Sequence, residues 1–173
     1  MTNPYNDLSD QKTIDKLSCS LIEFINITPI PRSSTVHTHI AILFKHPKNN
    51  PIILSYGVNE YVNNKTPINN CNTIHAEMKV ISNWLKNNFS QKSIISFRRS
   101  KYNIFVTQKS KTGSFGTSLP CKHCVEKLHY FGINKIYWTN VFGDIHSAKP
   151  SDLIDKQILN CTSGNRKKSD YHH

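Results

Sequence analysis

Two short segments that carry metal-ligand side chains, each at the start of a predicted helix, constrain the fold of this chain more than any other feature. The first is TIHAE (73–77) and the second is LPCKHC (119–124). Cys121 and Cys124 are three residues apart, so in the first turn of a helix both sulfurs can face one side and share a metal ion. The free N–H groups and the dipole at a helix start favour thiolates, the form that binds zinc.

His75 can supply a neutral imidazole as a third ligand. Three protein ligands leave one tetrahedral position for water, which is typical of a catalytic zinc site. Glu77 lies two residues further on, and at a helix start both side chains can reach a shared point. A carboxylate beside a zinc-bound water can take its proton and pass it to a ring nitrogen. A structural zinc site or an inactive relative is the alternative, but neither requires Glu77.

Hydrophobic periodicity predicts a chain in which helices and strands alternate around these segments. We expect helices over 8–26, from 73 onward, over 121–131 and over 150–160, and strands over 36–44, 52–58, 102–107, 135–141 and 145–148. This order predicts an α/β fold, a three-layer α/β/α sandwich with one five-stranded mixed sheet. From residue 73 the period is helical, and Ile74, Met78, Ile81 and Leu85 form one stripe.

The rest of the chain is expected to connect these elements. We predict loops over 59–72 and 109–118, the second of them flexible because of its two glycines. No linker separates two domains, so residues 1–160 are expected to form one domain with its core over 35–148. Residues 161–173 are predicted to be a flexible polar tail.

The two segments together match the H-x-E…P-C-x-x-C signature of zinc base deaminases. Over roughly residues 35–148 the chain resembles the cytidine/deoxycytidylate deaminase superfamily. The resemblance implies a cytidine deaminase-like fold, one Zn²⁺ per chain held by His75, Cys121 and Cys124, and hydrolytic deamination with Glu77 as the proton shuttle. It also implies that Asn59 contacts the sugar of the substrate. Ala76 and Pro120, the neighbours of the ligands, are assigned to the same substrate site.

The connection after the fourth predicted strand separates the branches of this superfamily. Parallel fourth and fifth strands need a helix between them, whereas antiparallel strands need only a tight turn. Phe142-Gly143-Asp144 is too short for a crossover. The resemblance is therefore to the antiparallel-hairpin division, in a polynucleotide- or toxin-type member, and cytosine is the expected target base.

The formal charge of +11 indicates a polyanionic substrate. It comes from residues 24–125, where Glu60 and Glu77 are the only acids among thirteen basic residues. Cations interleaved with aromatic side chains are what single-stranded nucleic acid needs. We therefore predict single-stranded DNA or RNA as substrate and partner. Its expected contacts are Arg98, Arg99, Lys109, Lys111 and Phe115.

Alternatives remain open. The aromatic side chains of this segment can instead belong to the core, and Arg98 and Arg99 to a solvated turn. A free cytidine, deoxycytidine or (d)CMP deaminase of pyrimidine salvage would need only one or two of the cations. A non-catalytic zinc protein that binds nucleic acid is a further alternative. The sequence does not decide the oligomeric state.

Hydropathy and cysteine usage set the expected environment. No apolar run approaches the roughly 20 residues of a membrane span, and the N-terminus is too polar for a secretory signal. Five cysteines are too few for a disulfide scaffold. We therefore expect a soluble, intracellular protein with no membrane partner.

Overall fold

A computed structural model of the chain describes residues 8–27, 37–45, 51–61, 73–88, 97, 101–110 and 112–155. Its elements, in chain order, are α1 (Leu8–Ile27), β1 (His37–Lys45), β2 (Ile52–Val58), β3 (Glu60–Tyr61), β4 (Thr73–Ile74), α2 (Ala76–Asn87), β5 (Asn103–Ser110), β6 (Phe115–Gly116), α4 (Lys122–Tyr130), β7 (Lys135–Thr139), β8 (Ile145–Ala148) and α5 (Pro150–Asp155). Among the described residues, no helix has both the length and the apolarity that crossing a bilayer requires.

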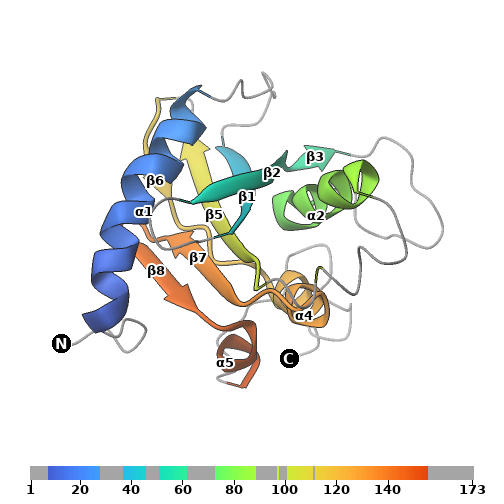
Figure 1. Ribbon diagram of the computed structural model, residues 1–173. Helices are drawn as coiled ribbons and strands as arrows, with labels where there is room; N and C mark the ends of the chain where they lie inside the picture. Colours follow the sequence, from blue (N-terminus) through green and yellow to red (C-terminus); the bar gives the residue numbers. More distant parts are fainter. Residues whose placement is uncertain are drawn as a thin grey trace, which may run out of the picture.

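The strands form one mixed sheet in the order β2-β1-β5-β7-β8, with β6 added at the end of β5 (Figure 1). Strands β5 and β7 are parallel, while the β1–β2, β1–β5 and β7–β8 pairs are antiparallel. The five-stranded mixed sheet predicted from the sequence is therefore confirmed, with one short strand in addition. The antiparallel β7–β8 pair also confirms the predicted tight turn between the last two strands.

Helices cover both faces of the sheet, which makes the three-layer sandwich that the periodicity predicts (Figure 1). On one face, α1 buries Leu17, Leu21 and Ile25 against Ile40 of β1 and Phe105 of β5. On the other face, side chains of α2, α4 and α5 form a second core with the opposite sides of β1, β5 and β7. Alternation along the strands separates the two cores, because successive side chains point to opposite faces.

The buried side of the helix after His75 is wider than the predicted stripe. Of the stripe, Ile81 is 2% exposed and Met78 and Leu85 pack against the same core, while Ile74 is 37% exposed. Ala76, Val80 and Trp84 are buried as well. Ala76 and Val80 lie where α2 comes close to β2: a Cβ on Gly57 would lie 2.5 Å from the Val80 nitrogen and 2.9 Å from the Ala76 oxygen. The absence of that side chain lets α2 contact the sheet along the Ala76–Val80 side.

Two predicted loops contain strands. Residues 109–118 are not a simple loop, because β5 continues to Ser110 and returns through β6, where Lys109 pairs with Phe115. The predicted loop over 59–72 begins with β3, which pairs with β4 just before α2. Two-residue strands leave no periodic signal in the sequence. The predicted tail over 161–173, and residues 156–160 of the predicted last helix, lie outside the described residues.

Candidate metal centre

Two of the predicted metal ligands are the residues at which their helices begin. His75 is the N-cap of α2, with φ −69° and ψ 149°, and Cys121 is the N-cap of α4, with φ −68° and ψ 161°. Neither side chain caps its own helix, so each is free to point away from it. The main-chain oxygens close the first turns instead: the Lys79 nitrogen donates to the His75 oxygen at 3.0 Å, and the Val125 nitrogen to the Cys121 oxygen at 3.0 Å.

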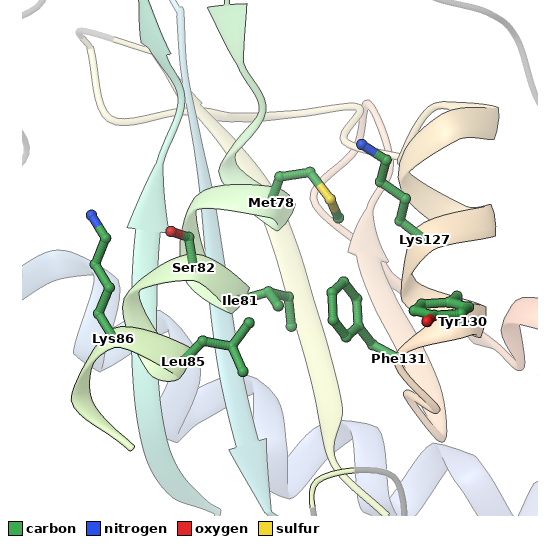
Figure 2. Close-up of a pocket in the computed structure, with 8 residues that line it drawn as sticks. All are labelled: Met78, Ile81, Ser82, Leu85, Lys86, Lys127, Tyr130 and Phe131. Carbon is green, nitrogen blue, oxygen red and sulfur yellow. The ribbon is translucent and has the colours of Figure 1, made fainter. Parts of the chain in front are cut away.

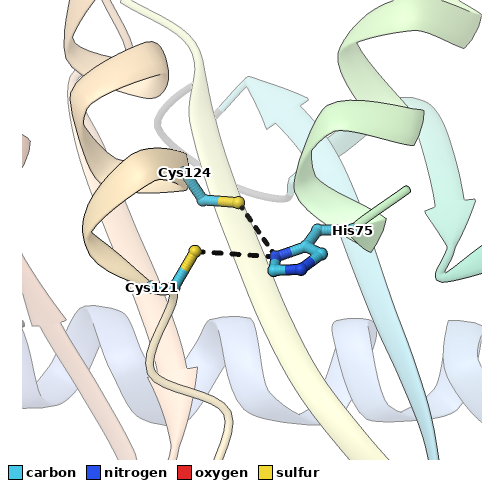
Figure 3. Close-up of side chains that lie close together, drawn as sticks. All are labelled: His75, Cys121 and Cys124. Atoms are coloured by element: carbon cyan, nitrogen blue, oxygen red, sulfur yellow. Dashed lines mark hydrogen bonds between the residues drawn. The ribbon is translucent and has the colours of Figure 1, made fainter. Parts of the chain in front are cut away.

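The two helix starts bring the three ligand atoms together (Figure 3). The Nδ1 atom of His75 lies 3.6 Å from the Cys121 sulfur and 3.3 Å from the Cys124 sulfur. All three ligand atoms lie within 4.8 Å of one another. In a tetrahedral zinc site, a nitrogen and a sulfur at their usual bond lengths are roughly 3.5 Å apart. The observed spacing therefore fits one zinc ion held by His75, Cys121 and Cys124.

The protonation of these groups also indicates a cation site. A hydrogen bond from the Cys124 thiol, followed by one from His75, lowers the pKa of Cys121 to about 4. The hydrogen bond to Cys121 raises the pKa of His75 and also that of Cys124, which burial raises further. His75 and Cys124 thus donate hydrogen bonds to the Cys121 thiolate and stabilise its negative charge, as a divalent cation would. The positive ends of the α2 and α4 dipoles add to this preference for thiolate.

Glu77 lies beside the three ligands in the first turn of α2. Its side chain is buried, with 5% of the residue exposed. Burial raises the pKa of Glu77, while its own backbone N–H, His75 and a hydrogen bond with Cys124 act in the opposite direction. A buried carboxyl group with a raised pKa next to a metal site is suited to move a proton.

Asn59 lies at the same end of the sheet. Antiparallel pairing of Glu60 with Ile74 and of Tyr61 with Thr73 means that one further step along the ladder sets Asn59 opposite His75. Its Oδ1 accepts a hydrogen bond of 2.9 Å from the His39 nitrogen. Its Nδ2 has no hydrogen-bond partner among the described residues. The half-buried amide of Asn59 thus has a free donor close to the metal ligands.

The remaining predicted substrate contacts lie in different places, and the structure describes only some of them. Ala76 and Pro120 are buried next to His75 and Cys121, as expected from their positions in the sequence. Lys109 instead donates a 3.1 Å hydrogen bond to Asn26 of α1. Phe115, its partner across β5 and β6, packs against the α1 core. Lys109 and Phe115 are therefore on the face of the sheet opposite α2 and α4. Arg98, Arg99 and Lys111 lie outside the described residues.

A pocket of about 500 Å³ lies between α2 and α4 (Figure 2). Its apolar lining includes Met78, Leu85 and Phe131, and Lys86 and Lys127 lie near its edges. No zinc ligand lines it, and neither does Glu77.

Sequence reasoning missed two features that hold this site in place. One is Gly57, for which a glycine inside a strand pattern was the available signal of a close backbone approach. The other is a set of buried hydroxyl groups on Thr107, Ser118 and Thr139. Serine and threonine in such positions have no distinctive pattern, so nothing in the sequence pointed to them.

A mixed α/β sheet with a His-Cys-Cys set at two converging helix N-termini defines a zinc protein with one ligand position left for water. Residues 38–140 match the family described as the cytidine and deoxycytidylate deaminase zinc-binding region. That match covers more than half of the chain, so the protein belongs to this family and is a zinc-dependent hydrolytic deaminase.

Other comparisons add little to this assignment. No curated protein sequence matches the chain. Among solved structures, the chain is similar to a crystal structure of dCMP deaminase from the cyanophage S-TIM5 in its apo form. The sequence identity is 16%, over 90% of this chain and 97% of that chain, with a TM-score of 0.42. A likeness at this level says nothing about the substrate of this chain.

Proposed function

We propose that the protein deaminates cytosine to uracil, with Glu77 as the group that moves the protons. The observation that carries this proposal is the position of the Glu77 carboxyl group, buried in the first turn of α2 against Cys124. A structural zinc site has no use for a buried carboxyl group there. Desolvating a carboxylate has a free-energy cost that only a proton or a partner offsets.

The chemistry needs one water, two proton movements and a leaving amine. When bound, zinc supplies a Lewis acid that lowers the pKa of water from about 16 to near 7. Glu77 takes a proton from the water that adds to C4 of cytosine and delivers it to N3. Glu77 then transfers the second proton of that water to the amino group, which leaves as ammonia, and C4 becomes a carbonyl carbon. Asn59 orients the sugar through its free Nδ2 donor.

The Glu77→Gln variant tests the enzyme proposal, because glutamine keeps the shape of the side chain but cannot shuttle protons. We expect ammonia release to fall by about 10²- to 10⁴-fold or more. Zinc content and the unfolding midpoint should stay close to those of the unmodified protein. If Glu77→Gln released ammonia at an unchanged rate, Glu77 would not be the proton shuttle. If the unmodified zinc protein bound nucleic acid but deaminated no cytosine substrate, the non-catalytic alternative would replace the proposal.

For the substrate we propose cytosine in single-stranded nucleic acid, supported by the charge distribution. Residues 78–125 contain nine basic side chains and no acidic one. One of the nine, Lys79, pairs with Glu60, so the charge of Glu60 is also neutralised. Lys122 at the start of α4 is exposed close to Cys121. Such a surface concentrates phosphates near the metal centre.

A free cytidine or deoxycytidine nucleotide is the second candidate, and a specific observation favours it. Phe97, Tyr102 and Phe105, three aromatic side chains of the basic segment, are between 0 and 6% exposed. Phe97 and Tyr102 pack on each other, with ring centroids 4.5 Å apart, and both contact Trp84. These rings belong to the core and offer no face on which a base could stack.

Ammonia release from two substrate sets separates the candidates. One set holds cytidine, deoxycytidine and their monophosphates, and the other holds single-stranded DNA and RNA oligomers that contain cytosine. A polynucleotide enzyme should lose activity steeply with added salt, because each neutralised phosphate adds to the salt dependence. Neutralising Arg98, Arg99 and Lys111 together should reduce that dependence, whereas Lys109, which lies on the face opposite α2 and α4, should contribute little.

The matched control removes lysines outside the basic segment. Lys149→Gln with Lys156→Gln should change the salt dependence much less per charge removed. Turnover restricted to the small molecules would reject the polynucleotide proposal and leave the nucleotide candidate. An unchanged rate on oligomers after the threefold substitution would reject Arg98, Arg99 and Lys111 as the phosphate contacts.

A further inference from the structure

Three buried hydroxyl groups join the segment before α4 to the ends of β5 and β7 through hydrogen bonds. Thr107 on β5, Thr139 on β7 and Ser118 between β6 and α4 are 0, 1 and 3% exposed. Both main-chain polar groups of Thr139 bind Ser118. The Ser118 nitrogen donates to the Thr139 oxygen at 3.0 Å, and the Thr139 nitrogen donates to the Ser118 Oγ at 3.0 Å. These bonds place Ser118 beside Thr139, as a residue of a strand next to β7 would lie.

The hydroxyl protons of this cluster have acceptors in one consistent arrangement. The Ser118 hydroxyl donates to the Val106 oxygen at 2.7 Å, and the Thr139 hydroxyl donates to the Gly116 oxygen at 2.7 Å. The Thr107 hydroxyl then donates to the Thr139 Oγ1 at 3.0 Å. Because every proton is used, the cluster is a satisfied buried network, and such networks rigidify the backbone that they join.

The connection from this cluster to the zinc ligands is short and held on both sides. Only Leu119 and Pro120 separate Ser118 from Cys121. Leu119 packs against the core under α2 and α4, and Pro120 is buried with a backbone fixed by its ring. Cys121 then begins α4, whose first turn carries Cys124.

His75 is held through different contacts. The close approach of α2 to Gly57 and the ion pair of Lys79 with Glu60 join the start of α2 to β2 and β3. The distance from His75 to the two sulfurs therefore depends on two independent anchors. One is the contact of α2 with β2, and the other is the hydroxyl cluster.

We propose that Ser118 and Thr139 are positioning residues of the zinc centre, which set where Cys121 and Cys124 lie relative to His75. They touch neither metal nor substrate. Their role depends on the zinc site of the family and holds for either candidate substrate. Partners behind the ligands of a metal site typically contribute about 10- to 100-fold to its metal affinity.

The test measures zinc affinity of the holoprotein by competition with a chromophoric chelator, together with the visible spectrum of the cobalt(II)-substituted protein. In Ser118→Ala and Thr139→Val we expect zinc affinity to fall by about 10- to 100-fold. We also expect the cobalt spectrum to change, because the sulfurs shift. Thr139→Ser keeps the hydroxyl group and should restore both readouts.

Two further variants separate positioning from stability. Ser147 is 2% exposed on β8, and its Oγ has no hydrogen-bond partner in the described part of the chain, so Ser147→Ala should leave zinc affinity and spectrum unchanged. Thr107→Val removes a buried hydroxyl group but leaves the Ser118–Thr139 pair intact. It should lower the unfolding midpoint with a smaller effect on zinc affinity.

Unchanged zinc affinity in folded Ser118→Ala and Thr139→Val would overturn the proposal. The proposal would also be overturned if Ser118→Ala and Thr139→Val lost no more zinc affinity than Thr107→Val loses at the same loss of stability. If Ser118→Ala does not fold, Thr139→Val gives the comparison, because it removes the bonds of the Thr139 hydroxyl to Gly116 and Ser118, which Thr107→Val leaves in place. No substrate enters the measurement, so its result is independent of whether the protein deaminates cytosine.

Discussion

Asn59 contains two hydrogen-bonding groups that can be separated by substitution. Its Oδ1 accepts from the His39 nitrogen, which joins the end of β2 to the start of β1, and its Nδ2 is the free donor that we assign to the substrate. Asn59→Asp keeps an acceptor for His39 and removes the donor. We expect this variant to keep the unfolding midpoint but to raise KM for the preferred substrate.

Asn59→Ala is the matched control, because it removes both groups. It should also lower stability, by about 1 kcal/mol for a lost hydrogen bond of this kind. Steady-state kinetics and urea unfolding measure the two effects. If KM were the same in the aspartate variant and in the unmodified protein, Asn59 would have only its structural role.

Among single residues, the sequence predicted those whose roles follow from their spacing along the chain. The i, i+3 spacing of Cys121 and Cys124 and the position of His75 at a helix start were enough to predict the metal centre. The Ser118–Thr139 pair was not predictable, because its members are 21 residues apart and serine and threonine pair with many partners. Lys109 was predicted to bind phosphate from its charge alone, and its hydrogen bond to Asn26 depends on the packing of α1.

The close packing of α2 on β2 leads to a prediction for a substitution of Gly57. A Cβ on Gly57 would lie 2.5 Å from the Val80 nitrogen, a backbone atom that cannot move without displacing the helix. We expect Gly57→Ala to cost about 1 to 3 kcal/mol of stability. Because α2 begins at His75, zinc affinity should fall as well.

Gly116→Ala is the control for this effect. Its Cβ would lie 2.6 Å from the Gln108 Oε1, which is the end of a flexible side chain. This variant should be close to unmodified in urea unfolding and in zinc competition. A Gly57→Ala protein with unchanged stability would contradict the close approach of the two backbones.

Elements were predicted well where periodicity is long and poorly where it is short. Strands β1, β2, β7 and β8 and helices α1 and α4 agree with the prediction to within one or two residues at most ends. The β6 strand and the β3–β4 pair have two residues each, too few for a period. The close contact of α2 with β2 depends on Gly57, which is 19 or more residues before the backbone atoms of α2 that it approaches, so local hydrophobicity did not predict this contact.

Removal of zinc should affect one side of the whole molecule. The metal joins the starts of α2 and α4 on one face of the sheet, while α1 has its own core on the other face. On chelation we expect faster amide hydrogen exchange around residues 74–79 and 118–125. Exchange in the middle of α1, around Leu17 and Leu21, should change little.

Hydrogen exchange detected by mass spectrometry measures both regions in one sample. A His75→Ala protein is the control, because chelator should add no further change to it. A uniform rise in exchange over both faces would show that zinc supports the entire fold and not only the α2–α4 side. The two-core arrangement behind this prediction was foreseeable from the alternation of β1, in which Ile40, Ile42 and Phe44 face one side.

The separation of the zinc ligands along the chain has a consequence for how the protein is made. His75 precedes Cys124 by 49 residues, and β5, which completes the sheet between β1 and β7, is synthesised in that interval. At about 5 to 20 residues per second, a ribosome needs several seconds to produce the missing ligands. A nascent chain with β1, β2 and α2 in place therefore has only one of the three donors. All three donors exist only after the chain has been made through Cys124, so in a zinc-loaded molecule β5 and the start of α4 are already in place, and metal loading is a late event of biogenesis.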